Sequence, residues 1–392
     1  MSEKKQKVLI VHNYYQIPGG EDTVVANEKK MLEDNGHEVV LYIRHNSELK
    51  ELSKLQKILL PVNTIFNFQT YREVKKIIKE QKINLVHVHN TLNLVSPSVY
   101  YAAFACHVPV VQTVHNFRLL CPGATFFRDG HVCEECLSKG LICAVKHKCY
   151  RGSRVQTLAC VISTLIHRMI GTYGKINYIC LTEFNKEKLL NLKQIKEEKI
   201  FVKPNFVEAV RELVPYEKRK DQFVYVGRLE EIKGMDILLK AWKHLGEQAP
   251  MLLMCGKGPL EEWCQDFIEE NHLANVEMLG FVPNEQVRKF VGESKALVLP
   301  TQVYEGFPMT IAEAYAAGTP VIGSDLGNTG SLIENEKNGL KFQPKSIEEL
   351  AEAVLKIRES FGGLGEEMIY KYSAENNYEQ LRNIYEACCN HH

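Results

Sequence analysis

The amino-acid sequence predicts an α/β protein of two domains, each with a doubly wound parallel β-sheet. Short, nearly continuous runs of valine and isoleucine alternate with longer amphipathic stretches, as expected of strands covered by helices on both faces. The alternation stops at Pro204 and resumes after a polar stretch that ends at Asp221. The chain has 392 residues, which exceeds the size that one hydrophobic core usually supports. We therefore expect a first domain over 1–205 and a second over 206–372.

The first domain begins with a strand and repeats the strand–helix unit several times. Its apolar runs predict strands at 7–12, 38–43, 84–89, 109–114, 178–182 and 199–203. Its amphipathic stretches predict helices at about 22–35, 69–81, 96–106, 155–170 and 184–193.

The second domain restarts the same rhythm. Its apolar runs predict strands at 222–226, 251–255, 275–279, 296–299, 320–323 and 339–342. The stretches between and after them predict helices at 234–245, 259–270, 284–292, 310–317 and 346–359. The tail that follows Tyr372 carries apolar residues at helical spacing, and the pattern alone predicts a further helix of this domain.

Charge is distributed unevenly, although the formal net charge is zero. Residues 1–205 carry 29 Lys and Arg against 18 Asp and Glu, and residues 206–392 carry 19 against 30. We therefore expect the first half to face an anionic partner, such as a phospholipid surface or a lipid-linked acceptor. Nucleic acid fits the charge alone, and a solvated lysine-rich surface is the alternative explanation.

The N-terminal residues lack the apolar segment of a secretory signal peptide, and no apolar run reaches the length that spans a bilayer. We therefore expect a cytoplasmic protein whose contact with a membrane, if it has one, is peripheral. In that compartment the twelve cysteines are expected to stay out of disulfides.

The most informative segment reads Y-E-G-F-P-M-T-I-A-E and places Glu305 and Glu313 on either side of a strand-to-helix connection. The preceding apolar run predicts a strand, and Thr310 lies in the first turn of the following helix. Gly306 lets the backbone approach a ligand closely. The helix N-terminus adds N–H groups and the positive end of a dipole. Such a loop suits an anionic ligand that also carries hydroxyl groups.

A second segment, V-G-R-L-E-E-I-K-G, follows another predicted strand and precedes another predicted helix. It places Arg228 and Lys233 where a cation is unfavourable against the helix dipole unless it serves an anion. Two cations, two carboxylates and a helix N-terminus suit a diphosphate with sugars on both sides. The chain contains no Asp-x-Asp sequence, so we expect the cations to replace a divalent metal.

These two segments, together with A-A-G-T-P-V-I at 316–322, resemble the C-terminal domain of the family-4 retaining glycosyltransferases. The first half resembles that family more loosely, through Gly19 and Gly20, the strand ending at His89 and T-V-H-N at 113–116. The resemblance implies the GT-B architecture, in which two Rossmann-like domains face a deep cleft. It also implies that the last helix, over 373–392, packs back onto the first domain.

The resemblance further implies a role for each candidate residue on the donor side. Arg228 and Lys233 would bind the diphosphate of a nucleotide-sugar, Glu313 would bind the ribose, and Glu305 would lie beside the transferred sugar. The base would rest near Val282, which leaves uracil and guanine undistinguished. Gly306 would let the backbone approach the ligand, and backbone N–H groups would bind phosphate oxygens from Phe307, Pro308, Met309 and Thr310.

On the acceptor side, the resemblance implies that His115 contacts the transferred sugar and that Gly19 and Gly20 approach phosphate or sugar. A strand-end histidine is more often a structural hydrogen-bonding group, which is the alternative for His115. His87 and His89 face the same side of one strand, and only His89 is a candidate for the site.

The reaction implied is transfer of a sugar, with retention, from a nucleotide-sugar to a hydroxyl of a saccharide or lipid-linked acceptor. In this mechanism the leaving phosphate takes the acceptor proton, so no side chain needs to act as the general base. A nucleotide-sugar epimerase or phosphorylase and a non-catalytic nucleotide-sugar-binding protein share the architecture and are the alternatives.

A cysteine-rich insert at 117–152 interrupts the α/β rhythm. Its spacing C-x2-C-x6-C-x5-C predicts a structural zinc site of four thiolates, and free thiols are the alternative of equal weight. The candidate ligands are Cys133, Cys136, Cys143 and Cys149. Basic residues at 146–154 then lead into the predicted helix 155–170. That helix either lies on an anionic membrane or packs against the sheet.

Overall fold

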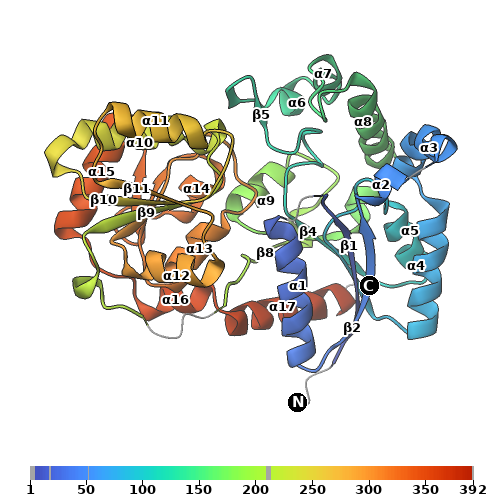
Figure 1. Cartoon of the computed structure of the whole chain (residues 1–392). Helices are drawn as coiled ribbons and strands as arrows, with labels where there is room; N and C mark the ends of the chain where they lie inside the picture. Colours follow the sequence, from blue (N-terminus) through green and yellow to red (C-terminus); the bar gives the residue numbers. More distant parts are fainter. Residues whose placement is uncertain (1–4, 17–18, 52, 209–212, 391–392) are drawn as a thin grey trace. The chain divides into compact units, whose positions relative to one another are not determined.

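The computed structural model describes residues 5–16, 19–51, 53–208 and 213–390. The chain forms two compact units, whose elements are labelled in Figure 1. Unit 1 contains residues up to Phe126, residues 133–204 and the chain from Tyr378 onward. Unit 2 contains residues 127–132 and 205–377.

The sheet of unit 1 has six parallel strands in the order β2-β1-β3-β4-β7-β8. The strands β1, β3 and β4 at its centre are almost completely buried, which explains their continuous apolar sequences. The strand bounds are β1 Lys7–Tyr14, β2 Glu38–His45, β3 Leu85–Val88, β4 Val110–Val114, β7 Asn177–Cys180 and β8 Ile200–Val202.

Helices connect these strands and cover the sheet. They are α1 Gly20–Asp34, α2 Glu48–Glu51, α3 Lys54–Ile65, α4 Phe68–Gln81, α5 Ser98–Phe104, α8 Arg154–Met169 and α9 Glu183–Leu189. The helix α3 was not predicted from the sequence, because it contains Pro61, which usually ends a helix. Its N-terminus is capped by Ser53, whose side chain accepts a hydrogen bond from the Gln56 N–H.

The insert forms small elements between β4 and α8: β5 Phe127–Arg128, β6 His131–Val132, α6 Glu135–Ser138 and α7 Ile142–Lys146. The strands β5 and β6 pair with each other in antiparallel orientation. The insert therefore departs from the α/β rhythm, as the sequence indicates.

The last helix, α17, spans Ala374–Asn390. The hydroxyl of Tyr378 lies 3.1 Å from His37 Nε2, and that of Tyr385 lies 2.8 Å from His87 Nδ1. Both histidines belong to unit 1, so these contacts attach α17 to the first sheet although its sequence follows the second. The sequence pattern alone assigned this helix to the second domain, and the family resemblance assigned it to the first.

The sheet of unit 2 also has six parallel strands, in the order β11-β10-β9-β12-β13-β14. Their bounds are β9 Gln222–Val226, β10 Met251–Cys255, β11 Val276–Gly280, β12 Ala296–Leu299, β13 Val321–Ser324 and β14 Gly339–Phe342. The helices are α10 Met235–Leu245, α11 Glu261–Glu270, α12 Asn284–Glu293, α13 Met309–Ala316, α14 Gly327–Leu332, α15 Ile347–Ser360 and α16 Glu366–Lys371.

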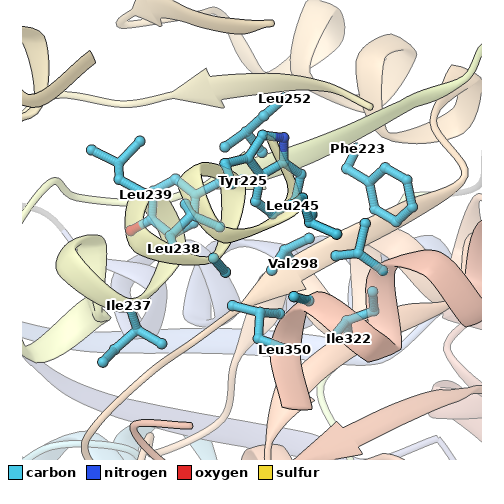
Figure 2. Close-up of a cluster of buried hydrophobic side chains, with 14 of the residues drawn as sticks. Phe223, Tyr225, Ile237, Leu238, Leu239, Leu245, Leu252, Val298, Ile322 and Leu350 are labelled. Carbon is cyan, nitrogen blue, oxygen red and sulfur yellow. The ribbon is translucent and has the colours of Figure 1, made fainter. Parts of the chain in front are cut away.

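A large hydrophobic core fixes this second sheet in place. Figure 2 shows Phe223 and Tyr225 of β9 among side chains of α10, β10, β12, β13 and α15. The indole of Trp242 is fully buried, and its N–H donates to the Pro250 carbonyl at 2.8 Å. A second cluster, which includes Val224, Leu297 and Tyr315, covers the opposite face of the sheet. Burial on both faces holds the strand ends, and therefore the loops that follow them, in fixed positions.

All predicted strands and helices are present, with bounds that match the expected ones or differ from them by up to four residues. The helices α2, α14 and α16 were missed together with α3. α14 begins Gly-Asn-Thr-Gly, a composition typical of a turn. None of the helices in the described part of the chain is both long and apolar enough to cross a bilayer.

Candidate functional site

A pocket of 350 Å³ lies in unit 2 at the carboxyl ends of the adjacent strands β9, β10 and β11. Arg228 follows β9, Lys257 follows β10, Val282 follows β11, and Glu313 projects from α13. In parallel α/β sheets this edge is the usual binding position for ligands. Three of the residues predicted from the sequence therefore line one pocket. Lys257 was not predicted.

Glycines allow the loops around this pocket to approach each other closely. A Cβ atom on Gly256 would lie 1.8 Å from the Gly227 carbonyl oxygen, and one on Gly258 would lie 2.3 Å from that of Leu229. Gly234 has φ +74°, and a Cβ there would lie 2.0 Å from the Pro300 oxygen. No other residue fits these positions without displacing backbone, so the glycines set the shape of the pocket edge.

Lys233 and Glu305 form an ion pair beside this edge. The ammonium of Lys233 lies 2.6 Å from Glu305 Oε1, and the hydroxyl of Thr301 donates to the same oxygen at 2.9 Å. Both charged side chains are largely buried. The side chain of Asn328 donates to the carbonyl oxygens of Glu305 and Gly306 at 2.6 and 2.7 Å, which holds the loop that carries the carboxylate.

Arg228 and Glu313, two of the three charged residues that line the pocket, differ in exposure. The Arg228 side chain is 70% exposed, and its Nε lies 3.6 Å from Glu230 Oε1. Glu313 is partly buried, and burial raises its pKa above the ordinary value, with the charge of Arg288 opposing the shift. An exposed guanidinium beside a partly desolvated carboxylate suits a ligand with an anionic group and hydroxyl groups.

The helix α13 begins at Met309, with Pro308 as its N-cap residue. Proline has no backbone N–H, so the expectation that each residue from Phe307 to Thr310 donates to phosphate is wrong for Pro308. The amides of Phe307, Met309 and Thr310 remain candidates, since the first turn of a helix lacks intrahelical acceptors.

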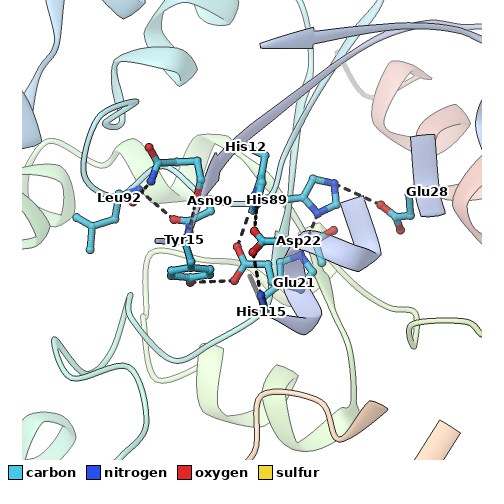
Figure 3. Close-up of polar contacts among 12 residues, drawn as sticks. His12, Tyr15, Glu21, Asp22, Glu28, His89, Asn90, Leu92 and His115 are labelled. Carbon is cyan, nitrogen blue, oxygen red and sulfur yellow. Dashed lines mark hydrogen bonds and ion pairs between the residues drawn. The ribbon is translucent and has the colours of Figure 1, made fainter. Parts of the chain in front are cut away.

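In unit 1, buried histidines gather where β1, β3 and β4 end. Figure 3 shows His89 between Glu28 of α1 and His115, which follows β4. The Nδ1 atom of His89 lies 2.9 Å from His115 Nε2, and its Nε2 lies 3.3 Å from Glu28 Oε2. The other Glu28 oxygen accepts from the fully buried ammonium of Lys203 at 2.8 Å. The predicted pair His89 and His115 is therefore in direct contact.

The N-terminus of α1 is occupied by its own carboxylate. The Gly19 N–H donates to Asp22 Oδ2 at 2.9 Å, and Asp22 Oδ1 lies 2.7 Å from His12 Nε2. A Cβ on Gly19 would meet no atom within 4 Å, and its φ of −131° is open to any residue. Asp22 therefore weakens the expectation of an anion at Gly19 and Gly20, although the space beside Gly19 is open. Pro18, which precedes Gly19 in the sequence, lies outside the described residues.

Burial shifts the protonation of this region. It raises the pKa of Glu21 to about 8, a shift opposed by the Tyr15 hydroxyl that donates to Glu21 Oε2 at 3.0 Å. It also lowers the pKa of His115 to about 3 and that of His89 well below the ordinary value. Both histidines are therefore neutral at physiological pH.

A cavity of 80 Å³ in unit 1 is lined by His89, Asn90, His115, Asn116 and Arg118, among others. It holds the histidine pair and one cation on its wall. The cavity contains the acceptor-side residues His89 and His115 that the sequence predicts.

The sulfur atoms of Cys133, Cys136, Cys143 and Cys149 do not all lie within 4.8 Å of one another. Among the described residues, one group of potential metal ligands has its ligand atoms all within 4.8 Å of one another, and it consists of Glu28, His87 and His89. The thiol of Cys136 donates a hydrogen bond to Cys121, which lowers the pKa of Cys121 below the ordinary value despite burial. The backbone N–H groups of Gly123, Ala124 and Phe126 add to this effect. Cys121 was not among the predicted ligands, and zinc binding at the predicted four stays a prediction.

Other residues of these sites also escaped the sequence analysis. Lys257 has a detectable signal, because Gly256 and Gly258 flank it directly after a strand. Glu28 and Lys203 have none, since they lie 175 residues apart and meet only in the folded chain.

Two family models match the chain. Residues 206–371 match the family described as glycosyl transferases group 1, and residues 18–132 match glycosyltransferase family 4. An uncharacterized glycosyltransferase of Methanocaldococcus jannaschii is 25% identical over 97% of this chain and 98% of its own length. The putative teichuronic acid biosynthesis glycosyltransferase TuaC of Bacillus subtilis is 33% identical over 42% of this chain and 38% of its own.

Solved structures share the fold. The lipopolysaccharide outer core galactosyltransferase WaaB, in its apo form, matches with a TM-score of 0.66 at 18% identity, over 96% of this chain and 98% of that one. The Anabaena protein HepE, in complex with UDP and glucose, matches with a TM-score of 0.59 at 16% identity, over 96% and 98%. The predicted fold class, α/β with two Rossmann-like domains of the GT-B type, is confirmed.

Proposed function

Because the chain belongs to the family-4, group 1 glycosyltransferases, we propose that it transfers a sugar, with retention, from a nucleotide-sugar to a hydroxyl of a saccharide or lipid-linked acceptor. Synthesis of a cell-surface polysaccharide or glycolipid is the proposed setting, which the similarity to TuaC supports. The observation that carries the proposal is the unit 2 pocket, which is lined by Arg228, Lys257 and Glu313, together with the Lys233–Glu305 ion pair of the same unit.

On the donor side, Glu313 would accept hydrogen bonds from the ribose hydroxyls, and Arg228 and Lys233 would bind the diphosphate. As the glycosidic bond breaks, negative charge grows on the leaving phosphate, and fixed cations stabilise that charge. Glu305 would grip the hydroxyls of the sugar and stabilise its developing positive charge. The 2.6 Å contact of Lys233 with Glu305 supports adjacent diphosphate and sugar positions.

On the acceptor side, His115 would contact the transferred sugar, and the leaving phosphate would take the proton of the attacking hydroxyl. In this proposal no side chain acts as the general base, and the cations make a divalent metal unnecessary for catalysis. A structural zinc in the insert would be separate from the reaction.

We further propose peripheral contact with an anionic membrane at the inner face of the cell membrane. One side of α8 carries exposed apolar residues at helical spacing, namely Val155, Leu158, Ile162, Leu165 and Met169. The exposed fractions of Val155 and Met169 are 72% and 84%. The neighbouring α3 adds the exposed Leu59 and Val62. The basic residues at 146–154 precede this face, and such a combination of apolar and basic groups is typical of interfacial helices.

A thermal-shift screen of UDP, GDP, ADP and their sugars tests the donor class. A ligand that binds only the folded state raises its stability by RT ln(1 + [L]/Kd), so one base should stand out. The matching nucleotide-sugar is then incubated with candidate acceptors in excess EDTA. Retained turnover supports the proposal, and a strict Mg²⁺ or Mn²⁺ requirement contradicts its metal-free form. A donor rearranged without acceptor, detected by product NMR, would indicate an epimerase.

A further inference from the structure

The buried charges of unit 1 lead through two histidines to the wall of a cavity. Four side chains contact one another in a row. The ammonium of Lys203 contacts the carboxylate of Glu28, which lies next to the imidazole of His89, and His89 contacts the imidazole of His115. Lys203 and Glu28 are almost completely buried, whereas His115 is partly exposed and lines the cavity. The series therefore begins in the core and ends at a partly exposed side chain on the cavity wall.

Glu28 is ionised in this arrangement. Its Oε1 accepts from Lys203 Nζ at 2.8 Å, and the positive charge holds the pKa of Glu28 below the ordinary value despite complete burial. An ionised carboxylate has no hydrogen to donate. Its second oxygen, Oε2, lies 3.3 Å from His89 Nε2. Neither of these two atoms makes a hydrogen bond to any described residue. Because the negative charge of Oε2 lies this close to Nε2, an N–H on Nε2 is favoured over a bare nitrogen, and we place the proton of neutral His89 there.

The proton on His89 Nε2 determines which atom donates in the contact between His89 and His115. A neutral imidazole has one N–H, so His89 Nδ1 is then a bare acceptor. His115 Nε2 lies 2.9 Å from it and must donate, which leaves His115 Nδ1 without a proton. No hydrogen bond from another described residue reaches that Nδ1 atom. The reverse arrangement would give His115 an N–H at the same position.

The neighbouring His87 does not disturb this order. Its Nδ1 lies 2.8 Å from the Tyr385 hydroxyl and 3.8 Å from Glu28 Oε2, and its Nε2 lies 2.7 Å from the Thr113 hydroxyl. Hydroxyl groups donate or accept, so either protonation of His87 is compatible. Tyr385 stays protonated, since burial raises its pKa.

We propose that the Lys203–Glu28 ion pair fixes the tautomers of His89 and His115, so that His115 Nδ1 is a hydrogen-bond acceptor for a substrate hydroxyl. Glu28, Lys203 and His89 are positioning residues in this inference, because they act through His115. The inference rests on the proposed function, in which His115 contacts the transferred sugar. It adds which group donates the hydrogen bond: His115 Nδ1 accepts, so the sugar must present a hydroxyl and not an oxygen that carries no hydrogen.

Glu28, His87 and His89 also have the spacing of a metal site. The ammonium of Lys203 argues against one, because it already neutralises the carboxylate at 2.8 Å and would repel a cation. Elemental analysis decides this point. A transition metal bound by the wild type and lost in a Glu28→Gln variant would overturn the proposal.

The direct test is nitrogen NMR of the full chain with ¹⁵N-labelled histidine rings, since bare and protonated ring nitrogens have distinct shifts. The His115 and His89 signals are assigned by their loss in His115→Gln and His89→Gln. We expect Nε2–H and bare Nδ1 for both histidines in the wild type. A protonated Nδ1 on His115 would overturn the proposal. This measurement requires no change to the ion pair.

Turnover provides the second readout. A double variant, Glu28→Gln with Lys203→Met, removes both charges together, so that no buried charge is left unpaired. We expect it to lower turnover about five- to tenfold, the scale of one hydrogen bond, with nucleotide affinity unchanged. In a His115→Ala background the same double change should cost less than about twofold, because coupled residues are not additive. Additive losses would overturn the proposal.

The contact of His115 with the sugar and the fixed tautomer of His115 can be tested separately. If His115→Ala leaves turnover unchanged, the proposed sugar contact of His115 is wrong, whatever tautomer the NMR measurement finds. If His115→Ala lowers turnover but Nδ1 carries the proton, the contact stands and the fixed acceptor is wrong.

Discussion

The ammonium of Lys233 contacts Glu305 Oε1 at 2.6 Å, although 72 residues separate the two in the sequence. Lys233 lies on the connection between β9 and α10, and Glu305 lies on the loop between β12 and α13. The hydrogen bond from Thr301 to the same oxygen fixes the carboxylate further. This pair links the proposed diphosphate position to the proposed sugar position.

Loss of either donor-side cation should cut turnover about 10²–10³-fold, the scale for removing a preorganised charge stabiliser. The variants are Arg228→Ala and Lys233→Ala, and the measurement is nucleoside diphosphate release. Lys243→Ala is the matched control, because Lys243 is exposed on the neighbouring helix α10. Turnover within about twofold of wild type for both variants would contradict the diphosphate assignment.

Replacement of Glu313 and replacement of Glu305 should change different kinetic constants. Glu313→Gln is expected to weaken donor binding, since its carboxylate faces the pocket beside Arg228, and should raise the donor KM. Glu305→Gln is expected to lower kcat and to leave nucleotide affinity near wild type, because its carboxylate lies at the proposed sugar position. Steady-state kinetics with varied donor separates the two. Equal changes in KM for both variants would refute the division of roles.

Glu21 should make the stability of the protein fall as pH rises. Burial raises its pKa from 4.5 in the unfolded chain to about 8 in the folded one. Between those values the folded state holds a proton that the unfolded state has released. The free energy of unfolding therefore falls by up to about 1.4 kcal/mol per pH unit from this group.

Glu21→Gln removes that contribution, so its unfolding free energy should decline less steeply than that of the wild type across this pH range. Denaturant titrations at several pH values measure the difference. Glu33→Gln is the control, because Glu33 is an exposed carboxylate on the same helix. Parallel curves for wild type and Glu21→Gln would show that Glu21 ionises normally in the folded state.

The cysteine insert predicts about one zinc per chain after anaerobic purification, measured by elemental analysis. If the ligands are Cys133, Cys136, Cys143 and Cys149, then Cys143→Ser should lose the metal and Cys121→Ser should keep it. The opposite result would replace Cys143 by Cys121, which contacts Cys136 in the structure. A metal-free wild type would discard the site altogether.

The exposed face of α8 predicts binding to anionic vesicles. Replacing Leu158, Ile162 and Leu165 together by serine should reduce co-sedimentation, because apolar contact with the lipid is lost. Met251→Ser, at an exposed apolar residue of unit 2, is the control. Binding should also weaken as salt rises, since screening is strong beyond about 10 Å at 0.1 M. Vesicle binding that ignores both changes would remove the proposed membrane role.

Most of the fold could be predicted from the sequence, because the strands are buried on both faces and read as continuous apolar runs. The prediction of secondary structure failed where the local sequence preference differs from the element that the segment forms. Pro61 lies inside α3, and α14 begins with residues typical of a turn. Packing against neighbouring elements overrides weak local preferences in such segments.

The donor site was largely predictable and the interior of unit 1 was not. Arg228 and Glu313 lie in motifs whose order along strand, loop and helix indicates their use. The pairing of Glu28 with Lys203 depends on α1 and the end of β8 meeting across the sheet, and no local pattern signals it. Lys203 directly precedes Pro204, where the sequence suggested only a domain end.

Calorimetric titration with the nucleoside diphosphate that gives the largest thermal shift tests the central claim most directly. The account predicts one site per chain in the wild type, clearly weaker binding in Glu313→Gln and in Arg228→Ala, and nearly unchanged binding in Glu305→Gln. Binding that is absent from the wild type, or unaffected in both Glu313→Gln and Arg228→Ala, would contradict a nucleotide-sugar site in unit 2.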